Sequence, residues 1–114
     1  MAESSRLIIK GSTTILPIAS EIGREFQNRH PGVEVSVSGG GSLAGLQALI
    51  AGEAQIATSS IFIPEQEIQE AWRRNVYPVP FRIAYDCILP IVNVSNPVTN
   101  LSLSPLKKKY ISVR

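Results

Sequence analysis

The order of apolar and polar positions predicts three strands, each followed by a loop and a helix. An apolar run at residues 7–9 breaks at Gly11 into three hydroxyl residues, which is typical of a strand, a tight turn and a helix start. Valine alternates with polar residues over 33–37, a period of two that predicts a second strand. Residues 55–58 are a shorter third strand. The strand, loop and helix unit is therefore repeated along the chain.

Apolar residues at helical spacing follow each of these strands. The first helix ends near Asn28, the second is closed by Gly52, and the third opens at Pro64 and ends at Asn75. The residues expected on their apolar faces are Ile15, Ile18, Ala19, Ile22, Phe26, Leu43, Leu46, Ile50, Ile68, Ala71 and Trp72. This alternation indicates an α/β fold, an open three-layer sheet with helices on both faces.

Hydroxyl residues follow all three predicted strands. Such loops lie together at the carboxyl ends of the strands, where open α/β sheets bind ligands. Ser12, Thr13 and Thr14 fill the first loop, at a helix start whose first N–H groups lack intrahelical partners and favour an anion. The alternative is that Ser12 or Thr13 serves simply as a helix N-cap.

The second loop contains three consecutive glycines, 39–41, before Ser42. Glycines let the backbone approach a ligand closely, and Ser42 is placed as the N-cap of the next helix. Residues 39–44 match a G-x-G-x-x-A dinucleotide fingerprint, but they lie in the second strand–helix unit and Glu53 is too near to be its ribose-binding acid. The third loop supplies Ser59 and Ser60.

The rest of the chain is less regular. We expect a short strand over 76–80 and a longer apolar one over 83–94, where Pro90 favours an edge position or a bulge. A last helix starts at Ser104 and Pro105, with Leu106 and Tyr110 on one side. The lysines at 107–109 then form a solvated face.

Composition narrows the possible functions. The 114 residues, 44% hydrophobic, predict one globular domain over 6–114, and 1–5 resemble a start added for expression. Eleven basic and nine acidic residues give a net charge of +2, without the broad basic face of a nucleic-acid binder. The single cysteine, Cys87, is expected to be a small buried hydrophobe, and His30 an exposed loop residue. No metal or other cofactor is expected, and no segment reaches the about 18 apolar residues of a membrane helix.

These motifs together resemble one family, the phosphate-binding proteins of bacterial phosphate ABC transporters. The matching stretches, in family order, are Lys10-Gly11-Ser12-Thr13-Thr14-Ile15-Leu16-Pro17, Pro31-Gly32-Val33 to Val37, Ser38-Gly39-Gly40-Gly41-Ser42, Ile56-Ala57-Thr58-Ser59-Ser60, Ile91-Val92-Asn93 and Asn96-Pro97-Val98. The resemblance implies a lobe of the class II periplasmic binding protein fold. It implies capture of a tetrahedral oxyanion in the periplasm or outside the cell, and delivery to a membrane permease, without enzymatic activity.

The resemblance also implies which residues hold the anion, by hydroxyl and backbone N–H donation. They are Ser12, Thr13, Thr14, Gly41, Ser42, Ser59 and Ser60. Whether the anion is phosphate or another oxyanion stays open. No nucleophile–base pair or phosphate-cradling lysine that would indicate an enzyme is evident.

The family closes its ligand between two lobes, and this sequence matches part of the first. The chain is then a fragment of a larger protein, a single lobe, or a lobe completed by a second copy in a homodimer. A rival hypothesis is an interaction or sensor module that keeps the fold without the ligand. The apolar pair Ile61 and Phe62 favours it, because the family carries charge at that rim.

Overall fold

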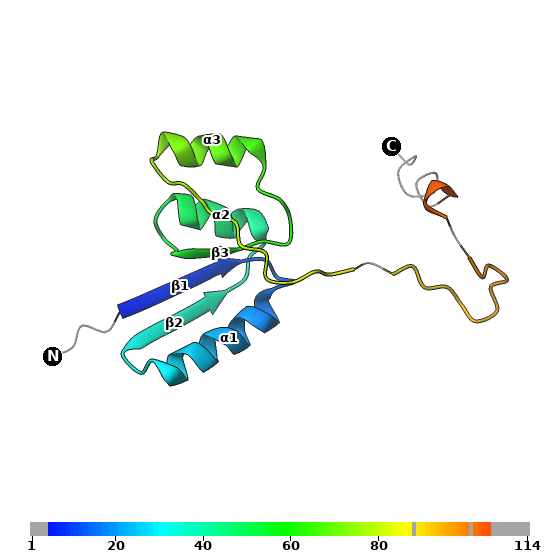
Figure 1. Cartoon of the computed structure of the whole chain (residues 1–114), viewed down its shortest axis with the longest axis horizontal. Helices are drawn as coiled ribbons and strands as arrows, with labels where there is room; N and C mark the ends of the chain where they lie inside the picture. The colour runs from blue at the N-terminus through cyan, green and yellow to red at the C-terminus, as the bar shows by residue number, and fades with distance from the viewer. Residues whose placement is uncertain (1–4, 88, 101, 106–114) are drawn as a thin grey trace. The chain divides into compact units, whose positions relative to one another are not determined.

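A computed structural model describes residues 5–87, 89–100 and 102–105. The chain divides into two units, Met1–Pro80 and Phe81–Arg114, which are described separately. The six labelled elements belong to the first unit (Figure 1). They are β1 (Ser5–Gly11), α1 (Leu16–Arg29), β2 (Val33–Ser38), α2 (Ser42–Ile50), β3 (Ile56–Thr58) and α3 (Glu65–Arg73).

The three strands form a parallel sheet in the order β2-β1-β3. Helix α1 packs on one face, where a Cβ at Gly23 would lie 2.9 Å from a methyl group of Val37. Helix α2 packs on the other face, against β1 and β3, as expected when parallel strands are joined by right-handed crossovers. The predicted α/β sheet with helices on both faces is confirmed.

The core lies between α2, α3 and the sheet. Leu46, Ile50 and Ala71 are buried there, and Ala71 is fully inaccessible to solvent. The apolar positions predicted for α2 are therefore confirmed at Leu46 and Ile50, whereas Leu43 is exposed. This core holds β3, and with it the loop after β3, against the centre of the sheet.

The apolar faces of α1 and α3 are wider than the surfaces that cover them. Trp72 is 56% exposed, so the prediction that it faces inward is wrong. It lies about 100° around the helix from Ala71, and α2 covers the Ala71 side. Ile18 and Ile22 of α1 are likewise exposed, while Gly23 makes the close contact with the sheet.

Two helix starts differ from their predicted positions. Helix α1 begins at Leu16 with Ile15 as its N-cap and without a side-chain cap, so neither Ser12 nor Thr13 is the N-cap. Helix α2 begins at Ser42 itself, and Gly41 is the N-cap. The prediction that Ser42 caps the helix is therefore wrong. Its hydroxyl bonds to the loop after β3 instead.

The strands predicted over 76–80 and 83–94 are absent from the described residues. Apolar alternation alone does not make a strand, because its backbone groups need a paired neighbour. Cys87 is exposed, so the prediction that it is buried is wrong for the same reason. A helical turn occupies 103–105, at the predicted last helix, but Leu106, Tyr110 and the lysines at 107–109 lie outside the described residues.

Candidate functional site

Main-chain hydrogen bonds join the three loops at the carboxyl edge of the sheet. Ser12 N–H donates to the Thr58 carbonyl at 2.9 Å, which ties the first loop to the end of β3. Gly41 N–H donates to the Gly11 carbonyl at 2.9 Å, which ties the glycine loop to the end of β1. The predicted meeting of three hydroxyl-bearing loops is therefore what the structure shows.

Ser42 and Ser60 are in direct contact. Ser60 N–H donates to Ser42 Oγ at 3.1 Å, and the two Oγ atoms lie 3.3 Å apart. Ser42 Oγ accepts this N–H, and either hydroxyl can be the donor between the two Oγ atoms, so the Ser42 hydrogen is available to a ligand when Ser60 is that donor. The first turn of α2 thus presents a hydroxyl donor beside its own N–H groups, which have no intrahelical acceptors.

The first loop offers one buried residue and two exposed ones. Ser12 is 2% exposed, and its N–H is used by Thr58. Thr13 and Thr14 are exposed and lie in the turn that precedes α1. Since Leu16 N–H is the first of the helix to bond back, to the Ser12 carbonyl, the N–H groups at 13–15 precede the hydrogen-bonded ladder. This turn can donate several hydrogen bonds in one direction.

Gly41 and Ser59 use their hydrogen-bond donors within the chain and so have fewer left for an anion. The N–H of Gly41 is committed to Gly11, and its φ of 101° is one that residues with a Cβ rarely adopt. The backbone conformation of Gly41 therefore orients Ser42, and Gly41 itself has no free N–H for an anion. The Ser59 hydroxyl donates to the Ile61 carbonyl at 2.7 Å and accepts Ile61 N–H at 3.2 Å, which shapes the third loop.

Lys10 lies beside this site and was missed by the sequence reasoning. It is the penultimate residue of β1, and a Cβ built at Gly40 would lie 3.9 Å from Lys10 Cε. The lysine stem therefore runs along the glycine loop. Its position one residue before the strand ends was the available signal, since such residues lie near a ligand at this edge.

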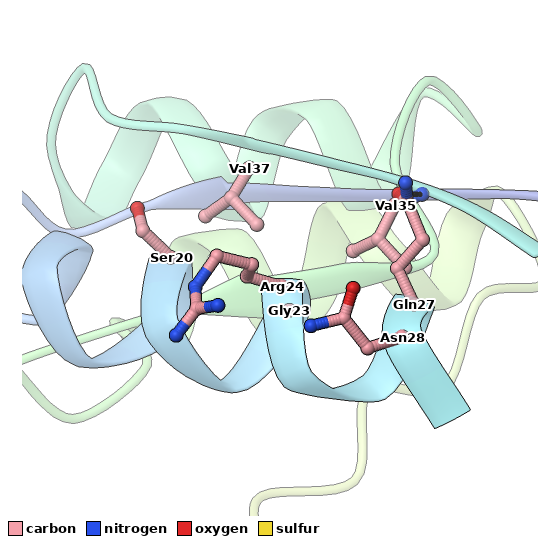
Figure 2. Close-up of a pocket in the computed structure, with 7 residues that line it drawn as sticks. All are labelled: Ser20, Gly23, Arg24, Gln27, Asn28, Val35 and Val37. Carbon is pink, nitrogen blue, oxygen red and sulfur yellow. Dashed lines mark hydrogen bonds between the residues drawn. The ribbon is translucent and has the colours of Figure 1, made fainter. Parts of the chain in front are cut away.

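Two hollows in the described part of the chain lie away from the loops. One is a groove between α1 and β2 (Figure 2), whose floor is formed by Gly23, Val35 and Val37 and whose rim is polar. The other lies between α2 and α3. None of the predicted anion-binding residues lines either one.

The described ranges contain neither a metal-binding cluster nor a membrane-spanning helix. No group of three or more His, Cys, Asp or Glu side chains there could hold a metal ion. No helix in those ranges has the length and apolar content to span a bilayer. What the site does offer is a set of uncharged donors and one neighbouring lysine stem.

Comparison with known proteins shows the family of this chain. A family model described as the PBP superfamily domain matches residues 2–110, nearly the whole chain. The chain belongs to the PBP superfamily. Its relatives confirm the resemblance drawn from the sequence motifs, because they include a protein named as phosphate-binding and one named as a phosphate transport receptor.

Two curated relatives are similar over most of this PBP-superfamily chain. Protein SphX of Synechococcus elongatus is 29% identical over 109 residues, which cover 96% of this chain and 32% of the relative. The phosphate-binding protein PstS of Staphylococcus haemolyticus is 32% identical over 102 residues, 89% of this chain and 32% of the relative. The chain thus spans about a third of the length of these relatives.

Solved structures share the fold of the PBP-superfamily domain. A possible phosphate binding protein from Planctomyces limnophilus has a TM-score of 0.61 at 29% identity, over 63% of this chain and 25% of that one. An ABC-type phosphate transport receptor from Vibrio cholerae has a TM-score of 0.54 at 36% identity, over 55% and 25%. A Clostridium perfringens relative, described as a putative phosphate ABC transporter substrate-binding protein with bound phosphate, has a TM-score of 0.53 at 25% identity.

Proposed function

We propose that this chain binds inorganic phosphate, or a similar tetrahedral oxyanion, at the carboxyl edge of its sheet. The observation that carries the proposal is the convergence of three donor-bearing loops, held together by the Ser12–Thr58 and Gly41–Gly11 main-chain bonds. The names of the relatives support the choice of anion. The proposed role is capture of the anion, without catalysis.

The chemistry of binding follows from the donors. The N–H groups at 13–15 and at the start of α2 carry the positive ends of two helix dipoles, which favour a bound anion. Ser42 donates its hydroxyl to the anion while its oxygen continues to accept Ser60 N–H. Charge-assisted bonds of this kind are about twice as strong as neutral ones. The remaining proposed contacts to the anion come from Ser12 Oγ, Thr13, Thr14 and Ser60.

We further propose that the captured anion is passed to a membrane ABC permease, and that the chain works in the periplasm or outside the cell. The name of the Vibrio cholerae relative supports the transport role. Thr13, Thr14, Ser59 and Ser60 are exposed, so a second protein surface is needed to enclose the anion. In this proposal that surface comes from the other lobe of a longer protein or from a second copy of the chain.

A second candidate function is a module that binds another protein at this edge. Phe62 is 89% exposed and Ile61 51%, directly after the third loop. An exposed apolar pair is more typical of a protein contact than of an anion site. The two functions differ in one measurable property, which is whether the chain binds phosphate.

The test is isothermal titration of the chain with phosphate, sulfate and molybdate, alongside light scattering for mass. We expect saturable heat with phosphate. A mass of two chains that forms only with phosphate would support a second copy as the enclosing surface. Binding by a single chain would overturn the need for an enclosing surface. No heat with any of the three anions would overturn the anion-binding function of this chain and favour the protein-binding alternative.

A further inference from the structure

Strand β2 forms one edge of the sheet, and its outward N–H groups can be identified. Ser5 N–H donates to the Gly32 carbonyl at 3.2 Å, so even-numbered positions at this end face β1. Since alternate residues of a strand direct their main-chain groups to opposite edges, Val33, Val35 and Val37 direct theirs outward. These outward groups are the ones that an added strand would use.

Two of the three outward N–H groups are already bonded within the chain. Val33 N–H donates to the His30 carbonyl at 2.9 Å, in the turn before the strand. Val35 N–H donates to Gln27 Oε1 at 2.8 Å, across eight residues of sequence. Gln27 therefore reaches from the last turn of α1 over the groove of Figure 2 to the middle of β2.

The sequence of β2 is compatible with pairing to a second copy of itself. In an antiparallel pair centred on Val35, Val33 lies opposite Val37 and Glu34 lies opposite Ser36. All the valines then share one face and no like charges oppose each other. The central bond of that pair joins Val35 N–H of one copy to the Val35 carbonyl of the other. Within the chain, Gln27 Oε1 already accepts the Val35 N–H that this central bond would use.

We propose that Gln27 is an edge guard, which prevents β2 from pairing with β2 of a second copy. The side-chain amide supplies the acceptor that Val35 N–H would otherwise find in another strand. The guard concerns the β2 edge, on the far side of β1 from β3, so it leaves association through β3 or through the three loops unaffected.

Three single variants of the full chain test the guard. Gln27→Met keeps the length of the side chain but removes the acceptor, whereas Gln27→Glu keeps an acceptor oxygen. Asn28→Ala is the matched control, since Asn28 lines the same groove but does not accept the Val35 N–H. We measure mass by light scattering at rising protein concentration and amide hydrogen exchange at Val35 and Val37.

We expect Gln27→Met to show an association step with rising concentration that the wild type lacks, and Val35 exchange about tenfold faster at low concentration. Gln27→Glu and Asn28→Ala should match the wild type in both measurements. An unchanged mass for Gln27→Met, or the same association in Gln27→Glu, would overturn the proposal. If Gln27→Met does not fold, amide hydrogen exchange in the wild type tests the proposal instead. The Val35 N–H must then exchange more slowly than the Val37 N–H, and equal rates would overturn the proposal.

Discussion

Gly45 of α2 lies directly against Gly11 at the end of β1. A Cβ built at Gly45 would lie 2.4 Å from Gly11 Cα and 2.3 Å from the Lys10 carbonyl oxygen. Real Cβ atoms do not approach backbone this closely, so any side chain here must push α2 away from the sheet. Because α2 begins at Ser42, this contact also sets how closely Ser42 lies to the end of β1.

The first prediction concerns this helix–strand contact. Gly45→Ala should lower the free energy of unfolding by about 3 kcal/mol, the upper end of the range for overpacking, since the atoms in the way are backbone. Gly32→Ala is the matched control, because nothing lies within 4 Å of its Cβ position, and it should change stability by less than about 0.5 kcal/mol. Urea denaturation measures both. Equal effects of the two variants would contradict the prediction.

The second prediction concerns the hydroxyl shared by two loops. Ser42→Ala removes the acceptor of Ser60 N–H and the proposed donor to the anion. We expect phosphate affinity to fall about tenfold, the equivalent of about 1.4 kcal/mol, with a much smaller change in stability because Ser60 is exposed to water. Titration calorimetry gives the affinity. Ser20→Ala on α1 is the control and should bind as the wild type does.

The third prediction concerns Lys10, whose stem lies beside the glycine loop. Lys10→Met should weaken phosphate binding, and the loss should shrink as salt is raised, because salt screens charges near the surface. Arg6→Met removes the same charge from the opposite end of β1 and controls for net charge. If the two variants bind phosphate equally well at low salt, the position of Lys10 has no special importance.

The fourth prediction concerns an ion pair on α3. Arg74 Nε donates to Glu70 Oε1 at 2.7 Å, and this bond, with Arg73 nearby, holds the pKa of Glu70 below its ordinary value of 4.5. A carboxyl with a depressed folded pKa stabilises the fold above its unfolded pKa. That contribution disappears as pH falls through the folded pKa.

Arg74→Gln should therefore raise the pKa of Glu70 toward its ordinary value, as followed by NMR titration of the side-chain carboxyl. It should also reduce the loss of stability on acidification below pH 4.5. By the same linkage the variant should be less stable than the wild type at neutral pH by the same small amount, because exposed ion pairs contribute little. Arg29→Gln, which breaks the comparable pair with Glu25 on α1, should leave the Glu70 titration unaltered.

Local sequence pattern determined the elements of the first unit. Alternating valines, helical spacing of apolar residues and the position of Pro64 predicted three strands and three helices within a few residues, because each depends on neighbours along the chain. The relative direction of the strands could also be predicted from the sequence. Strands separated by helices run parallel, so the hydroxyl residues after β1, β2 and β3 had to meet at one edge.

Contacts between distant residues were decided by the tertiary structure alone. Ser42 was predicted as a helix cap, yet its oxygen accepts an N–H eighteen residues away, which no local pattern encodes. The link from Gln27 to Val35 and the exposure of Cys87 depend in the same way on which surfaces lie side by side. The sequence determined the helices and strands, and it determined that the loops after the strands meet at the carboxyl edge of the sheet. Packing across the sheet determined which donors remain for a ligand, because each hydrogen bond made within the fold removes one.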